Sequence, residues 1–119
     1  MHNFKELNVW KESKDFSLSV YKITKDFPKS ELYGLTSQLN RASVSIPSNI
    51  AEGSGRETNK DFSRFINIAL GSSFEVETQL IIAFELELIP KSDYDKLIAS
   101  LNQIQKMLHS FNKFIKSKE

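Results

Sequence analysis

Residues 45–56, SIPSNIAEGSGR, place a proline inside a helical hydrophobic pattern and end in a Gly-x-Gly. Within a helix, Pro47 lacks an amide donor and frees the carbonyl of Ser43, four residues earlier, at a cost of about 3 kcal/mol. We therefore predict tertiary packing that stabilises a helix bent at Pro47, and a hydroxyl or water that donates to the carbonyl of Ser43. Gly53 and Gly55 should end this helix with the positive φ common at helix C-termini.

Four stretches carry apolar residues at steps of three and four positions, as amphipathic helices do, and no stretch alternates strictly as a strand would. Polar residues at their starts can accept hydrogen bonds from the unpaired amides of the first turn. The expected N-caps are Asn8, Ser30, Thr58 and Ser92. The expected core residues are Val9, Phe16, Val20, Ile23 and Phe27; Leu32, Leu35, Leu39, Ala42, Ile46 and Ile50; Phe62, Phe65, Ile66, Ala69, Ser73, Val76, Leu80 and Phe84; and Leu97, Leu101, Ile104, Leu108, Phe111 and Ile115.

The connections between these stretches are short, about three to six residues, so consecutive helices should be antiparallel neighbours. The chain has 119 residues, 39% of them hydrophobic, which is enough for one domain with an ordinary core. We predict an all-α fold, an up-down-up-down antiparallel four-helix bundle formed by residues 1–119. The sequence has no cysteine, no signal-like N-terminus and no apolar run of about twenty residues, which indicates a soluble, cytoplasmic protein that does not enter the membrane.

Residues for catalysis or metal binding do not form a known pattern. His2 follows the initiator, His109 is expected on the surface of the fourth helix, and neither Glu-x-x-His nor His-Glu-x-x-His occurs. Glu75 and Glu77 lie two positions apart and so point in different directions on a helix. We predict no enzymatic activity, no metal and no cofactor.

Two glycine positions leave alternatives open. The turn at residues 53–56 could hold a phosphate with its backbone amides and Arg56. It could instead be a helix end in which Arg56 pairs with Glu52, and Glu52 is also expected near the amides of the third helix. Gly71, inside the third helix, is expected to allow close approach of the second helix or of a neighbouring subunit.

Two ordered motifs resemble the signatures of a bacterial family of small four-helix-bundle proteins encoded by intervening sequences within 23S rRNA genes. They are Gln38-x-x-Arg41-Ala42-x-x-Ser45-Ile46-Pro47-x-Asn49-Ile50-Ala51-Glu52-Gly53-x-Gly55-Arg56 and Phe62-x-x-Phe65 with Ala69-x-Gly71-Ser72-x-x-Glu75. The resemblance covers nearly the whole chain. It departs at Asn40, where a second arginine often stands, and at Glu87, where glycine is common. The structural motif residues that it implies are Pro47, Asn49, Glu52, Gly53, Gly55, Gly71, Ser72 and Glu75.

The resemblance implies a homopentamer with no established enzymatic activity. A related branch, the accessory proteins of diversity-generating retroelements, binds nucleic acid and a reverse transcriptase through a basic surface. The implied partners are therefore further copies of the chain, RNA or DNA, or a reverse transcriptase-like protein. Self-association also agrees with a second apolar stripe on the third helix, Ile68, Ile82 and Leu86, which a lone bundle would expose.

The expected topology separates charges by end, although the formal net charge is only +1. Basic residues outnumber acidic ones where the first and third helices start and the second and fourth end. We expect a non-catalytic oligomer whose basic rim attracts nucleic acid or a nucleic-acid enzyme. The alternative is a structural or protein-interaction oligomer without a nucleic-acid role. The candidate nucleic-acid-binding residues are Arg41, Arg56, Lys60, Arg64, Lys106, Lys113 and Lys116.

Overall fold

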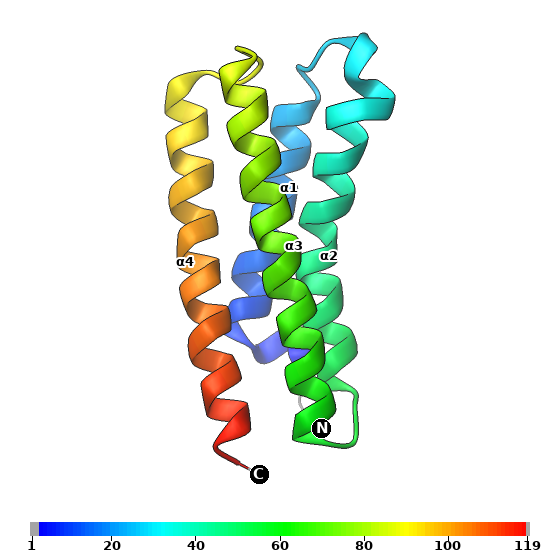
Figure 1. The fold of residues 1–119 in the computed structure, drawn as a ribbon, viewed down its shortest axis with the longest axis vertical. Coiled ribbons are helices and arrows are strands. Elements are labelled where there is room, and N and C mark those ends of the chain that lie inside the picture. The colour runs from blue at the N-terminus through cyan, green and yellow to red at the C-terminus, as the bar shows by residue number, and fades with distance from the viewer. Residues whose placement is uncertain (1–2, 119) are drawn as a thin grey trace.

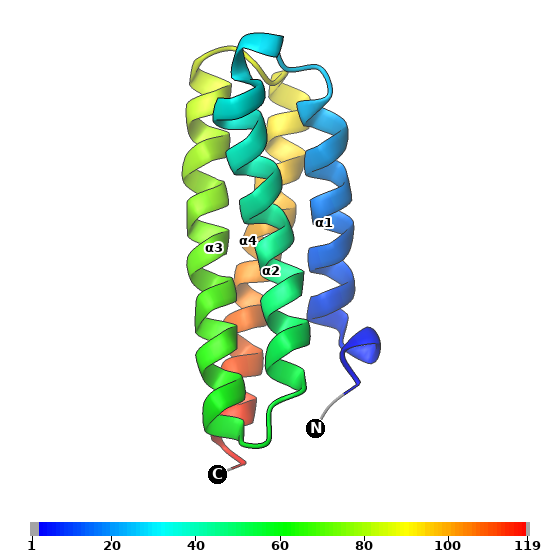
Figure 2. The ribbon, with the colours of Figure 1, turned by 90° about the vertical axis from the view of Figure 1, so that its right-hand side faces the viewer.

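The computed structural model describes residues 3–118, which form four long α-helices and no β-strand. His2 and Glu119 lie outside the described residues. The long helices are α1 (Asn8–Thr24), α2 (Ser37–Ser54), α3 (Asn59–Glu85) and α4 (Lys91–Lys116), and the short ones are η1 (Phe4–Glu6), η2 (Lys29–Glu31) and η3 (Leu32–Thr36). The long helices lie side by side and alternate in direction, with both termini at the end that holds the α2–α3 turn (Figure 1, Figure 2). The prediction of an all-α chain with four helices is confirmed.

The predicted apolar stripes form one core. Most of the expected residues are buried there, with Leu39, Ile46 and Leu101 fully inaccessible to solvent, whereas Ile23, Leu35 and Phe111 are half-buried. Leu32 is an exception, because it lies in η3 before α2 begins and is 51% exposed. Phe84 is half-buried and stacks on Tyr94 of α4 with ring centroids 4.2 Å apart.

α2 continues through Pro47, and the proline side chain is buried in the bundle. The carbonyl of Ser43 accepts a hydrogen bond of 2.8 Å from the hydroxyl of Ser17 on α1, which also lies 3.0 Å from the carbonyl of Ser13. The prediction of a hydroxyl partner for Ser43 is therefore confirmed. A bend at Pro47 stays a prediction.

Only one of the expected N-caps has that role. Thr58 accepts from the amide of Asp61 at 3.1 Å, as predicted. Asn8 is already inside α1, which begins after an extended Leu7, and α4 begins directly after Pro90 without a side-chain cap, so Asn8 and Ser92 were wrong.

The predicted start of the second helix near Ser30 is also wrong. The connection from α1 spans residues 25–36 and holds two short helices, so α2 begins at Ser37. The carboxylate of Glu31, rather than Ser30, accepts a hydrogen bond from the backbone amide of Leu35 at 3.3 Å. This local bond stabilises a turn that hydrophobic periodicity does not reveal.

The glycines at the end of α2 do not have the predicted backbone conformation. No described glycine has a positive φ, and Gly55 has φ −89°. Gly53 is needed for packing instead, because a Cβ there would lie 2.7 Å from Cβ of Phe65 and 2.8 Å from Cδ1 of Phe62. The missing side chain therefore lets α3 approach α2 closely.

The residue with positive φ lies at the end of α3. Glu87 has φ 63°, the left-handed conformation that favours glycine. The amide of Leu88 donates to the carbonyl of Ala83, and that of Glu87 donates to the carbonyl of Phe84, both at 2.9 Å. These two bonds form a Schellman motif, with glutamate where such motifs usually have glycine.

Candidate nucleic-acid interface

The α2–α3 turn brings two of the predicted arginines onto one aromatic ring. The guanidinium carbons of Arg56 and Arg64 lie 4.6 and 4.5 Å from the ring centroid of Phe65, which is only 6% exposed. Asp61 pairs with both arginines, with N–O distances of 3.8 Å to Arg56 and 3.0 Å to Arg64. Both arginines therefore cover the core and share the carboxylate of Asp61, which compensates part of their charge.

The glycine turn itself is a helix end, one of the two alternatives that the sequence left open. The amides of Gly55 and Arg56 donate to the carbonyls of Glu52 and Gly53, at 3.3 and 3.0 Å. Arg56 also pairs with the carboxylate of Glu52 at 3.3 Å. The turn's amides and its arginine are thus satisfied within the chain.

A shallow groove follows the start of α3 on its outer side. It has a volume of about 420 Å³ and is lined by Thr58, Lys60, Asp61, Ser63, Arg64 and Asn67. Asn112 of α4 accepts from the hydroxyl of Ser63 at 2.6 Å and donates to Asn67 at 3.2 Å. These bonds hold α4 beside the groove, and Lys113 follows Asn112 directly in the chain.

The outer face of α4 carries a stripe of cationic and titratable side chains, which we call the α4 stripe: Lys106, His109, Lys113 and Lys116. Their steps of three, four and three residues place them on one helix face, and all four are exposed. From Lys96 to Lys118 the chain contains five lysines and no aspartate or glutamate. Within residues 3–118, none of these lysines lies within ion-pair distance of a carboxylate.

Arg41 does not join the other predicted residues. Its guanidinium lies 3.9 Å from the carboxylate of Glu75, part-way along α3. Along α2, Arg41 is about 22 Å from Arg56, given 1.5 Å per helical residue. Its expected place at the basic end is therefore wrong, because Arg41 lies in the second turn of α2, which begins at the opposite end of the bundle.

The motif residues of α2 and α3 form a polar contact between these helices. The hydroxyls of Ser45 and Ser72 lie 2.8 Å apart, and the side-chain amide of Asn49 donates to the carbonyl of Ser45, also at 2.8 Å. One turn of α3 further along, the side-chain amide of Gln79 donates to Gln38 of α2 at 3.4 Å and to Glu75 of α3 at 3.2 Å. These motif residues therefore join two helices, and none of them lies in the groove at the start of α3.

Gly71 has a different environment from the one expected within the chain. It is exposed, and a Cβ at this position would have no atom within 4 Å. The second helix therefore does not require it, and only the neighbouring-subunit explanation stays a prediction. Gly71 lies among the exposed apolar residues of α3, which we call the α3 outer face: Ile68, Phe74, Ile81, Ile82 and Leu86.

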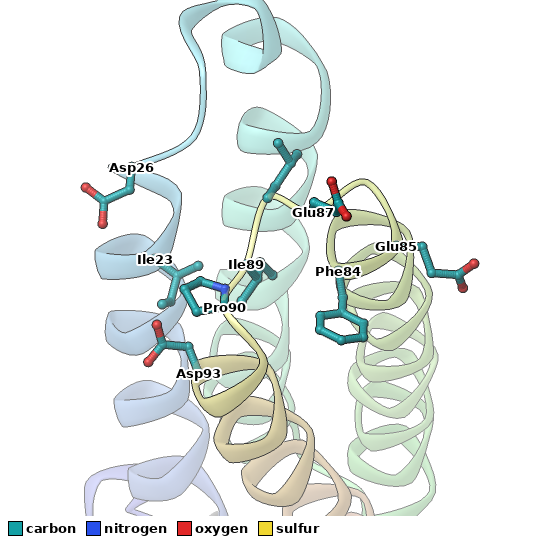
Figure 3. Close-up of a pocket in the computed structure, with 9 residues that line it drawn as sticks. Ile23, Asp26, Phe84, Glu85, Glu87, Ile89, Pro90 and Asp93 are labelled. Atoms are coloured by element: carbon teal, nitrogen blue, oxygen red, sulfur yellow. The ribbon is translucent and has the colours of Figure 1, made fainter.

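The opposite end of the bundle is acidic. A pocket of about 700 Å³ is lined by Ile23, Asp26, Phe84, Glu85, Glu87, Leu88, Ile89, Pro90 and Asp93. Asp26 and Glu85 point outward on opposite sides, so the carboxylates do not converge (Figure 3). Nearby, Lys91 pairs with Asp95 at 2.7 Å, and this hydrogen bond with the charge of Asp95 raises the pKa of Lys91.

Sequence reasoning missed aromatic and basic residues beside the α4 stripe. Phe114 is 50% exposed, and the ammonium of Lys118 lies 4.8 Å from its ring centroid. The absence of acidic residues between Lys96 and Lys118 was readable in the sequence and could have indicated this surface.

Further features of residues 3–118 concern metals and membranes. No three His, Asp or Glu side chains in this part of the chain lie close enough together to bind a metal ion. None of the helices described is both long and apolar enough to cross a membrane.

Comparison with known proteins places these features in a family. No curated protein matches the chain significantly. A crystal structure of a protein of unknown function from the S23 ribosomal protein family of Bacteroides thetaiotaomicron superposes with a TM-score of 0.82 and 26% sequence identity, and the match covers 88% of this chain and 95% of that one. The family model of the 23S rRNA-intervening sequence protein matches residues 5–110. The chain therefore belongs to the 23S rRNA-intervening sequence protein family.

Proposed function

We propose that the protein is a non-catalytic homo-oligomer that binds nucleic acid through the α4 stripe and the neighbouring Lys60. The observation that carries the proposal is the run from Lys106 to Lys118, with four lysines and no acidic residue. Such a run creates a positive surface whose attraction for phosphates does not depend on the chain's near-neutral net charge. The site has no converging acid, base or nucleophile, so it binds without reacting.

The second part of this proposal is that copies of the chain associate through the α3 outer face. The α3 outer face has five exposed large apolar residues, and Gly71 within it leaves room for another helix. Apolar patches of this kind usually mark an interaction surface. We take the number five for the subunits from the family resemblance, and a ring would bring several α4 stripes to one rim.

Nucleic-acid binding is tested by fluorescence anisotropy with RNA and DNA oligonucleotides at low and raised salt. We expect weak binding with little sequence preference that decreases steeply with salt, because bound lysines release counterions. Lys106→Glu with Lys113→Glu should lower affinity at least about tenfold without dissociating the oligomer.

The matched control is Lys22→Glu with Lys96→Glu. These lysines are also exposed, but they lie near the start of α4 and the end of α1, so the same charge change occurs at the opposite end. Affinity should stay within about twofold of the wild type. Equal losses in both double variants would mean that only net charge matters, which would contradict a site on the α4 stripe.

A structural or protein-interaction oligomer is the second candidate. It is favoured by the ion pairs of Arg41, Arg56 and Arg64, which are held by Glu75, Glu52 and Asp61. If the wild-type protein retains neither RNA nor DNA at low salt, this second function takes the place of the first.

A further inference from the structure

Contacts between cations and aromatic rings gather at one end of the bundle. In the part of the chain that the structure describes, they involve Lys5 with Phe4, Lys14 with Trp10, Arg56 and Arg64 with Phe65, and Lys118 with Phe114. These residues lie in η1, in the first turns of α1 and α3, in the α2–α3 turn, and at or just beyond the end of α4. Tyr33, at the other end, is 93% exposed but has no such contact. The basic end is therefore aromatic as well as positive.

Phe114 is the ring in this group that is open to a ligand. It is 50% exposed, whereas Phe65 is 6% exposed beneath its two arginines. Phe111 stacks against Phe114 with centroids 6.4 Å apart and planes at 23°, and it contacts the core residue Phe62 edge-on at 5.5 Å. The ring is thus supported from the core and is half exposed, and the Lys118 side chain that lies over it ends in a flexible ammonium group that a base could displace.

An apolar groove begins on the other side of Phe111. It lies between the start of α1 and α4, has a volume of about 470 Å³, and is lined by Glu6, Leu7, Asn8, Val9, Met107, Ser110 and Phe111. This volume lies within the range of small-molecule sites. Asn8 and Ser110 add hydrogen-bonding groups, which a flat heterocycle with polar edges can use.

We propose that the basic end binds single-stranded nucleic acid in preference to duplex, with an unpaired base stacked on Phe114 and phosphates near Lys113, Lys116 and Lys118. This inference rests on the proposed function. Lysines alone would hold any polyanion, but an exposed aromatic ring among them adds a contact that only an unstacked base can make. In a duplex the faces of the bases are covered by their neighbours, so Phe114 has nothing to stack on.

The test compares an oligo(U) strand, an oligo(dT) strand and a DNA duplex, each of about 20 nucleotides per strand, by anisotropy at one salt concentration. The wild type should bind the single strands about tenfold more tightly than the duplex. Phe114→Ala should remove about tenfold of the single-strand affinity and leave duplex binding within twofold, since stacking on one aromatic ring has this order of effect. Phe114→Tyr should keep the preference, because it keeps the ring.

A substitution at the neighbouring residue distinguishes the effect of base stacking from the effect of positive charge. Lys113→Ala, next in the chain, should weaken single-strand and duplex binding by the same factor and reduce the salt dependence. Phe114 is half exposed, so the folded oligomer should persist in the alanine variant, as circular dichroism and light scattering can check.

Three outcomes would overturn the inference in distinguishable ways. Equal wild-type affinity for duplex and single strands would refute the preference, and an unchanged single-strand affinity in Phe114→Ala would refute the stacked base. In both cases nucleic-acid binding itself would stand. Failure of the wild type to bind any of the probes would refute the proposed function and this inference with it.

Discussion

The hydroxyl of Ser17 compensates for the amide that Pro47 lacks. The proline leaves the carbonyl of Ser43 without its helical donor, and the side chain of Ser17 reaches this buried carbonyl from α1 at 2.8 Å. A buried carbonyl without a partner costs about 1–3 kcal/mol. The residue that permits proline inside α2 therefore lies on another helix, 26 positions before Ser43.

This compensation predicts a coupling between the two residues. Ser17→Ala should destabilise the protein by about 1–3 kcal/mol, because the carbonyl of Ser43 then has no donor. In a Pro47→Ala background, the restored backbone amide can donate to Ser43, so Ser17→Ala should cost about 0.5 kcal/mol or less. Urea denaturation of the wild type, both single variants and the double variant measures the cycle.

Ser19→Ala is the control for this cycle. Ser19 is exposed, and its hydroxyl donates only to the carbonyl of Asp15 within the same helix, so the change in stability should stay within about 0.5 kcal/mol. If Ser17→Ala lowers the free energy of unfolding equally with and without Pro47, the hydroxyl does not stabilise the freed carbonyl of Ser43, and the explanation is wrong.

Between helices, the pairing of α2 with α3 depends on two kinds of contact. At the turn, Gly53 removes the side chain that would collide with Phe62 and Phe65. Further along, the hydroxyl groups of Ser45 and Ser72 meet across the interface. Gly53 and Ser72, two of the motif residues, therefore lie where these two helices meet.

Three alanine substitutions distinguish this packing role from backbone freedom. Gly53→Ala should destabilise the bundle by about 1–3 kcal/mol, because neither Cβ of Phe65 nor the ring of Phe62 can move freely in the core. Gly55→Ala should have an effect within about 0.5 kcal/mol, since its new Cβ would lie 3.6 Å from the nearest atom at a negative φ. Gly71→Ala should raise the helix stability of the single chain by up to about 1 kcal/mol, but weaken self-association because its methyl group would fill the room proposed for a neighbouring helix.

Chemical denaturation at one fixed protein concentration allows these variants to be compared, because the stability of an oligomer depends on concentration. Equal effects at Gly53 and Gly55 would contradict the close approach as the reason for Gly53. A Gly71→Ala protein that is stable but dissociates would place Gly71 in a contact between subunits.

At the scale of the whole molecule, the bundle has two surfaces with different properties. The α3 outer face is apolar. The end that holds the α2–α3 turn (Figure 2) is basic and aromatic. We expect the first surface to assemble copies of the chain and the second to meet the ligand. The two functions should therefore respond to different substitutions.

The assembly prediction is that Ile82→Glu with Leu86→Glu converts the oligomer to a folded monomer, because each carboxylate would be buried without a partner at the subunit contact. Size-exclusion chromatography with light scattering at micromolar concentration measures the mass, and circular dichroism checks the helices. Leu18→Glu, at a similarly exposed leucine on α1, should leave the mass unchanged. A wild-type protein that is already monomeric would rule out assembly.

The sequence by itself determined the four helices, most of their buried faces, the Thr58 cap and the need for a donor to Ser43. Each of these follows from local rules: apolar spacing, a side chain within one turn of its amide, and the missing donor of proline. The family motifs were likewise readable, because they lie in order along two stretches of the chain.

Only the tertiary structure decided which residues from different helices meet. Arg41 of α2 lies beside Glu75 of α3, the hydroxyl of Ser17 rather than a water donates to the carbonyl of Ser43, and Arg56 and Arg64 cover Phe65. The spacing of residues along a helix shows in which direction a side chain points. It does not show which residues of a neighbouring helix lie opposite that side chain. Which residues lie opposite each other depends on the connections between helices. Because of the 25–36 connection, α2 begins at Ser37 and not at Glu31, a shift of six residues or about 9 Å along a helix. Contacts between helices therefore required the packed bundle.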